Sequence, residues 1–132
     1  MVAKVIYNIL STDTDLTAVI SGKVFPFVAP KDTQRPCIVY NIISHDDKKT
    51  KGNAGHPIRD YRVQLDIYAE SGIDCFEVAE LVESALNYKS GEFGGVCTWY
   101  TTLLNSMTDF EDDSEIFRYM LEYQVSIQFD NN

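Results

Sequence analysis

The C-terminal segment of the chain alternates apolar and polar residues over an unusual length. The apolar positions are Phe117, Tyr119, Leu121, Tyr123, Val125, Ile127 and Phe129. Alternation with a period of two predicts a β-strand with one buried face. A strand over residues 116–129 would be about 46 Å long, whereas a compact chain of this size has a diameter of about 36 Å. We therefore expect the strand to bend, to bulge or to reach beyond its own domain, where another subunit can pair with it.

Length and composition predict a single globular domain over residues 1–132. The chain is 45% hydrophobic and 23% charged, values typical of a folded domain rather than a disordered or fibrous chain. No basic leader precedes an apolar run, and no stretch approaches about 18 uninterrupted apolar residues. We therefore expect a soluble protein without a secretory signal or a membrane span.

The charge balance argues against nucleic-acid binding. The formal net charge is -9, and general binding to nucleic acid depends on clustered Lys and Arg that neutralise phosphates. One predicted turn is strongly acidic, with Asp109, Glu111, Asp112, Asp113 and Glu115. The one basic stretch lies between His45 and Arg62, where the cationic residues are Lys48, Lys49, Lys51, Arg59 and Arg62. These two stretches are the candidates for charged contacts.

Hydrophobic periodicity and capping residues predict the order of elements. A first helix carries apolar residues from Val2 to Leu10, and a second helix follows at 16–21. Strands are expected at 24–28, 37–44 and 59–70, a helix at 71–88, and two long strands at 96–110 and 116–129. Pro26 restricts the first strand to a sheet edge or a bulge. This order predicts an α+β fold with one twisted, largely antiparallel sheet of about five strands and helices packed on one face.

Two segments have specific local expectations. Residues 45–58 contain almost no apolar side chain, which predicts a long exposed hairpin loop. Ser71 and Asp74 form an S-x-x-D capping pattern at the start of the longest helix. The expected buried stripe of that helix consists of Cys75, Val78, Ala79, Val82, Ala85 and Leu86.

A search for chemistry yields no catalytic, cofactor or metal site. His45 and His56 lack a third ligand for zinc, and the acidic turn lacks the glycine and the spacing of a calcium loop. Nucleophile-elbow and phosphate-binding motifs are absent from the sequence. The three cysteines, Cys37, Cys75 and Cys97, are widely spaced, which predicts buried reduced thiols rather than disulfides. We therefore expect a protein that is not an enzyme and needs no cofactor.

The chain resembles the tail-completion or tail-terminator proteins of bacteriophages and prophages, of the small head-tail joining type. The resemblance covers nearly the whole chain. It rests on the segment DTDLTAVISGKVFP (13–26), the strand RPCIVY (35–40), the strand RDYRVQLDIYAES (59–71) before a helix, and the closing strand RYMLEYQVSI (118–127). These are patterns of order and apolar spacing, and the family has no active site to transfer.

The resemblance implies a structural morphogenesis protein of the virion tail that is assembled in the cytoplasm of the host bacterium. Such a protein forms a homo-hexameric ring, caps the tail tube and joins the tail to the head connector. The expected partners are therefore further copies of the chain, the tail-tube protein and the head-tail connector protein, without a membrane or specific nucleic acid. Lys48, Lys49, Lys51 and Arg59 are candidate partner contacts. The five acidic residues of 109–115 are candidates to face the lumen.

Two alternatives remain open at this stage. One is a cytoplasmic ligand-binding or regulatory α+β domain without catalysis, which would have a deep apolar pocket with converging polar groups. The other is a small hydrolase, which would need a nucleophile or carboxylate beside a base. Aromatic residues such as Tyr68 and Tyr100 alternate with the core positions of their strands. They fit a protein interface about as well as a sheet face covered by helices, and we expect at least some of them to lie at an interface.

Overall fold

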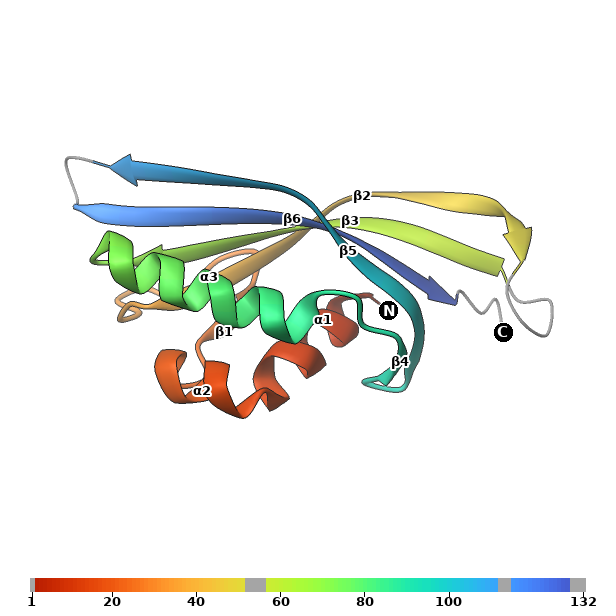
Figure 1. The fold of residues 1–132 in the computed structure, drawn as a ribbon, viewed down its shortest axis with the longest axis horizontal. Coiled ribbons are helices and arrows are strands. Elements are labelled where there is room, and N and C mark those ends of the chain that lie inside the picture. Colours follow the sequence, from red (N-terminus) through yellow and green to blue (C-terminus); the bar gives the residue numbers. More distant parts are fainter. Residues whose placement is uncertain (1, 52–56, 112–114, 129–132) are drawn as a thin grey trace.

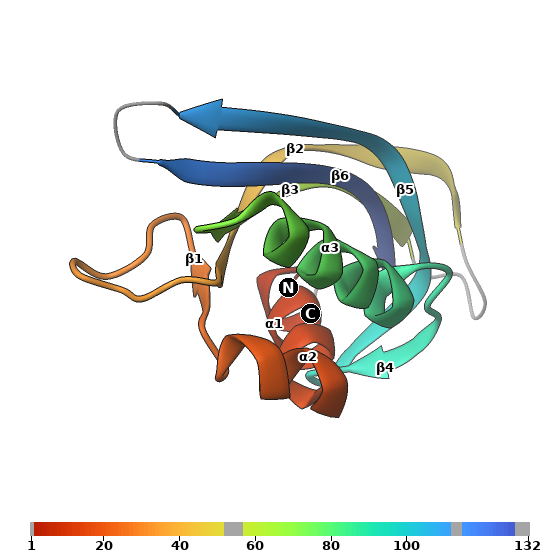
Figure 2. The same ribbon diagram turned by 60° about the vertical axis from the view of Figure 1, so that its left-hand side comes forward.

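The computed structural model describes residues 2–51, 57–111 and 115–128 of the chain. One six-stranded sheet has the order β1-β2-β3-β6-β5-β4, and three helices pack on one of its faces (Figures 1 and 2). The pair β1 and β2 is parallel, and every other pair is antiparallel. The elements are α1 (Val2–Thr12), α2 (Thr14–Ile20), β1 (Val24–Pro26), β2 (Cys37–Lys51), β3 (Pro57–Ala69), α3 (Gly72–Leu86), β4 (Gly91–Phe93), β5 (Val96–Glu111) and β6 (Ile116–Gln128). The α+β class is confirmed.

The sheet has one strand more than the sequence indicated, because the glycine-rich segment after α3 forms the short strand β4. Its three residues pair with Val96, Cys97 and Thr98 of β5. Gly94, in the turn between the two strands, has a positive φ of 58°. A Cβ atom at Gly94 would lie 3.1 Å from the Lys4 carbonyl oxygen, so this turn also needs glycine to pack against α1.

Side-chain caps mark the starts of α2 and α3, which run over Thr14–Ile20 and Gly72–Leu86 rather than over the expected 16–21 and 71–88. The Asp13 side chain accepts a hydrogen bond from the backbone N–H of Leu16 at 2.9 Å, at the start of α2. Ser71 caps α3 by accepting from the backbone N–H of Asp74 at 3.1 Å. All six residues of the predicted apolar stripe of α3 are buried, namely Cys75, Val78, Ala79, Val82, Ala85 and Leu86. Helix α3 therefore lies along the sheet with its apolar side inward.

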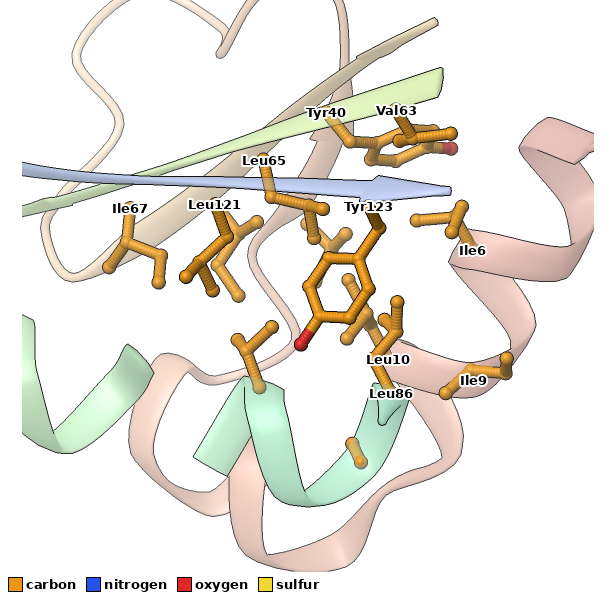
Figure 3. Close-up of a cluster of buried hydrophobic side chains, with 14 of the residues drawn as sticks. Ile6, Ile9, Leu10, Tyr40, Val63, Leu65, Ile67, Leu86, Leu121 and Tyr123 are labelled. Carbon is orange, nitrogen blue, oxygen red and sulfur yellow. The ribbon is translucent and has the colours of Figure 1, made fainter. Parts of the chain in front are cut away.

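The core lies between the sheet and the helices (Figure 3). Leu65 and Ile67 of β3 and Leu121 and Tyr123 of β6 point toward the helices and are fully buried. Tyr123 is among the largest fully buried side chains, and its hydroxyl donates a hydrogen bond to Asn87 Oδ1 at 2.5 Å. Burial raises the pKa of the Tyr123 phenol, and the nearby charge of Glu83 adds to this shift. The described part of β6 thus confirms the predicted inward face, while Phe129 lies outside the described residues.

The predicted exposed loop at 45–58 is wrong. Strand β2 continues to Lys51 and strand β3 begins at Pro57, so most of this segment is a two-stranded ribbon. His45 pairs with Tyr61, and Asp46 pairs with Asp60. A ribbon that leaves the helix layer has solvent on both faces and needs no apolar residue, because cross-strand hydrogen bonds satisfy its backbone. The lack of apolar side chains therefore marked distance from the core rather than an absence of strand.

The long strands are both bent and extended. Strand β5 is irregular against β6 between Thr98 and Tyr100 and between Leu103 and Asn105, and β2 is irregular against β3 between Ile42 and Ser44. Such bulges bend a strand and increase its twist. The β2–β3 and β5–β6 hairpins point away from each other at opposite ends of the sheet (Figure 1).

The cysteines differ from expectation in one case. Cys37 and Cys75 are buried, and burial raises the pKa of both thiols. Cys97 is exposed, which contradicts the prediction of three buried thiols. Its position in β5 explains the difference, because its partner across the ladder is Glu92 of the short edge strand β4 rather than a core residue.

Candidate assembly surfaces

The sheet has a second face, away from the helices, which we call the open face. It is formed by the alternate residues of β3 and β6 whose neighbours in sequence enter the core. On β3 they are Ile58, Asp60, Arg62, Gln64, Asp66 and Tyr68, and on β6 they are Arg118, Met120, Glu122, Gln124, Ser126 and Gln128. Most of them are polar, as expected for a sheet covered by helices on one side only.

The charges of the open face are paired with one another. Arg62 Nε lies 3.5 Å from Glu122 Oε1, and Arg118 Nε lies 3.4 Å from Asp66 Oδ1. The Asp66 side chain also accepts from the Gln64 amide at 3.2 Å. Asp66 is only 6% exposed, so its ion pair is shielded from solvent on one side. Both arginines of this face therefore have carboxylate partners within the subunit.

The predicted contact residues lie at the tip of the β2–β3 hairpin. Lys48 and Lys49 lie in β2 between Asp47 and Lys51, where the register against β3 shifts. Arg59 lies in β3, is half-buried and donates from Nη1 to the Tyr61 hydroxyl at 3.4 Å. The structure therefore brings these four cations to one end of the sheet, on strands rather than on a loop.

The predicted acidic residues lie at the opposite end, at the tip of the β5–β6 hairpin. Asp109 is exposed in β5 and is paired across the ladder with Arg118. Glu111 ends β5, and Glu115 is exposed in the turn with a positive φ of 53°. Asp112 and Asp113 lie outside the described residues. The sheet thus carries basic residues at one tip and acidic residues at the other.

An aromatic groove of about 320 Å³ lies between the β5–β6 tip and the start of α3. Phe110 stacks on Phe117 with ring centroids 4.3 Å apart, and Phe76 meets Tyr119 edge-on at 5.4 Å. Phe76 and Phe110 are both exposed. Exposed aromatic side chains beside a groove are typical of protein contact surfaces.

A second and larger groove, of about 760 Å³, lies on the helix side at the other end of the sheet. The residues that line it include Val2 of α1, Phe27, Ile42 of β2, Tyr61 of β3 and Val96 of β5. Among the described residues, no group of three His, Cys, Asp or Glu side chains is placed to hold a metal ion. Nor does the described part of the chain contain a helix long and apolar enough to cross a membrane.

Sequence reasoning missed one feature, the outer edge of β5. The segment WYTTLLNSMT (99–108) contains no charged residue, no Pro and no Gly. Pairing with β4 covers only Val96, Cys97 and Thr98. The absence of charge was visible in the sequence, but the position of this segment at a sheet edge was not.

The comparisons with known proteins agree with this architecture. Residues 4–128 match the family model described as "Tail completion protein gp17". The fold is similar to that of a chain in the solved structure "Virion of native gene transfer agent (GTA) particle", with a TM-score of 0.73 and 13% sequence identity. That match covers 95% of this chain and 92% of the other. A search of curated proteins found no significant match.

Proposed function

The chain belongs to the tail completion protein family, and from this premise we propose that it forms a ring that caps the tail tube and joins the tail to the head connector. Its role is structural, as a component of a phage-type tail. The proposed partners are further copies of the chain, the tail-tube protein and the head-tail connector protein. We propose that assembly takes place in the cytoplasm of the host bacterium.

The observation that carries the proposal is the elongated sheet with one helix-covered face and one polar face. A ring around a channel needs subunits with a wettable inner wall and an outer layer that is stable by itself. The open face meets the first requirement, since most of its side chains are polar and its arginines are paired with Glu122 and Asp66. The helices and their buried core meet the second.

The charge of the open face supports its placement at the lumen. Asp60, Asp66 and Glu122 outnumber Arg62 and Arg118 on β3 and β6, and Asp109 lies across the ladder from Arg118. An acidic wall repels the phosphates of DNA that passes through a channel. In this proposal, Asp109, Glu111, Asp112, Asp113 and Glu115 extend the acidic wall at one rim. A ring structure with these residues on the outer circumference would contradict this placement.

The two hairpin tips are the proposed axial contacts. The basic β2–β3 tip leaves the helix layer, so its backbone can reach a neighbouring ring without a change in the core (Figure 1). Lys48, Lys49, Lys51 and Arg59 provide charges for that contact. The residues of the opposite tip, that of the β5–β6 hairpin, are acidic rather than basic, so the two tips suit different partners.

Electron microscopy of the purified protein mixed with tail-tube protein tests the function. We expect tubes with a closed end and a narrow distribution of lengths, whereas tube protein alone keeps growing. Tubes that continue to elongate at the same rate in excess capping protein would refute the proposal. Tube protein mixed with an unrelated acidic protein of similar size serves as the control.

A further inference from the structure

Both borders of the long sheet are open along part of their length. At one border, β1 covers Ile38 to Tyr40 of β2, and the Phe27 N–H then donates to the Tyr40 carbonyl at 2.9 Å. Beyond this point, no strand of the described residues lies on the outer side of Asn41 to Asp46 of β2. At the other border, β4 covers the start of β5, and the Tyr88 N–H donates to the Thr101 carbonyl at 3.0 Å. From Thr102 to Thr108, β5 likewise has no outer strand within the part of the chain that the structure describes.

The open part of β5 lacks charged residues and Pro, two of the usual protections of a sheet edge. Natural edge strands avoid association through charged residues, Pro or very short lengths. Residues 102–108 contain no charged residue and no Pro, their irregularity is the bulge at Leu104, and Leu104 and Met107 are exposed. An unprotected edge of this length is a template for another strand.

The two open borders overlap in their position along the strand direction, which we call height, over a short stretch. Each border has a bulge within this stretch. Ile42, the residue before the β2 bulge, pairs with Val63 of β3, and Val63 pairs with Tyr123 of β6. Tyr123 is paired with Leu103, the residue before the β5 bulge. The bulge residues themselves, Ile43 and Leu104, therefore lie within about one residue of the same height on opposite borders.

Both bulge residues are aliphatic and exposed. Ile43 is 49% exposed and Leu104 is 41% exposed. Side chains of this type at matched heights fit each other when one copy of the sheet is placed beside the next.

We propose that the border of β5 in one copy pairs with the border of β2 in the next, with Leu104 packed against Ile43. The inference rests on the proposed ring. Its occupant is a second copy of the chain, because each copy provides both open borders and both bulges. The stretches that pair are Thr102–Asn105 and Asn41–Ser44, where neither border is covered by β1, β4 or Tyr88.

Strand direction is consistent with this pairing. Three antiparallel steps separate β2 from β5, so the two strands run in opposite directions within one subunit. Rotation about an axis along the strands preserves these directions, so β5 meets the neighbouring β2 in an antiparallel ladder. The contact joins two different patches, and repetition of such a contact closes a ring when the rotation per subunit fits.

Disulfide trapping tests the contact. The double variant Ile43→Cys with Leu104→Cys is prepared in a Cys97→Ser background, which leaves only the buried Cys37 and Cys75. Three strand spacings separate the two borders within a subunit, about 14 Å, whereas a disulfide needs Cα atoms within about 7 Å. Any disulfide between the introduced cysteines is therefore between copies.

Oxidation is carried out on the concentrated protein and on protein bound at tube ends. We expect a ladder of dimers, trimers and larger species on a non-reducing gel for the double variant, and no ladder for either single variant. Neighbouring positions Thr102 and Asn105 are tested with Ile43 to allow for a shift of one or two residues. No ladder from any pair in either preparation would overturn the inference. Efficient dimer formation by a single variant would do so too, because it would reveal a two-fold contact.

A matched pair of substitutions provides a second measurement. Leu104→Lys places a charge on the β5 edge, and Val19→Lys on α2 changes a residue of similar exposure, 43%, away from both borders. We expect both variants to melt like the original chain. Leu104→Lys is expected to weaken self-association at least about tenfold in sedimentation experiments, because a charge is poorly tolerated at a packed apolar contact. Equal association of the two variants would contradict the pairing.

The two proposals fail in different ways. If the unmodified protein caps tubes but no trapped ladder forms, the contact is wrong and the function stands. If a trapped ladder forms but tubes continue to grow, the contact stands and the function is wrong.

Discussion

Replacement of Tyr123 tests whether the interior face of β6 holds the domain together. Tyr123 is 0% exposed, and its ring is surrounded by α1, α3 and the neighbouring strands (Figure 3). Removal of a large buried aromatic side chain costs about 3–5 kcal/mol. A carboxylate left in the same place adds several kcal/mol of desolvation. Together these losses reach the typical stability of a domain, about 5–15 kcal/mol, so Tyr123→Asp should not fold.

Tyr123→Phe is the matched control because it retains the ring and removes only the hydroxyl. Asn87 loses its hydrogen bond but is half-buried and can bond to water instead. The expected loss is about 0.5–1.5 kcal/mol, which corresponds to a fall of a few degrees in Tm. Urea denaturation followed by far-UV and near-UV circular dichroism measures both variants. A soluble Tyr123→Asp variant with a cooperative transition near that of the original chain would show that this face is not the core.

Three further predictions concern pH, capping and assembly. Burial raises the pKa of the phenols of Tyr40 and Tyr123 above the ordinary value of about 10. As the pH rises, the unfolded chain therefore loses these protons before the folded chain does. The stabilisation is fully present below about pH 10, and the free energy of unfolding decreases as the pH rises further. Urea denaturation at about pH 8 and pH 10.5 should show this fall, with a smaller fall in Tyr123→Phe, and equal falls would refute the assignment. Ser71→Ala removes the cap of α3 and should lower the free energy of unfolding by about 1 kcal/mol. Ser90→Ala serves as a control outside the helix. Calorimetry that shows the same stability for the two variants would contradict the capping role. Lys48→Glu with Lys49→Glu should leave Tm unchanged within a few degrees and reduce the fraction of capped tubes in electron micrographs; normal capping would exclude the β2–β3 tip as the docking element.

The sequence was informative wherever a segment packs against the core. The helices and the inward faces of β3 and β6 were predictable because burial requires apolar residues at a fixed period. Ser71 was recognisable as a cap because a serine side-chain oxygen can accept from a nearby backbone N–H group, as it does from that of Asp74. These signals are local, so they survive without knowledge of the tertiary structure.

The parts that escaped prediction depend on contacts between distant segments. The extension of β2 to Lys51 comes from pairing with β3 rather than from its own side chains. The ion pairs of the open face join Arg62 to Glu122 and Arg118 to Asp66 across strands that are far apart in sequence. To predict that the bulges at Ile43 and Leu104 lie at similar heights, one must know the register of four strands. The alternation of residues within one strand does not give this register.

The bulges in β2 and β5 also bear on the choice between a circle and a fibre. A subunit that adds to its neighbour through two unlike borders has no intrinsic stopping point, and only its curvature determines whether the last copy meets the first. In the proposed contact, one extra residue in each strand contributes to that curvature, because it bends the backbone within the stretch that pairs. Deletion of Ile43 would straighten the join, and the same chain would then be expected to grow into open helical filaments.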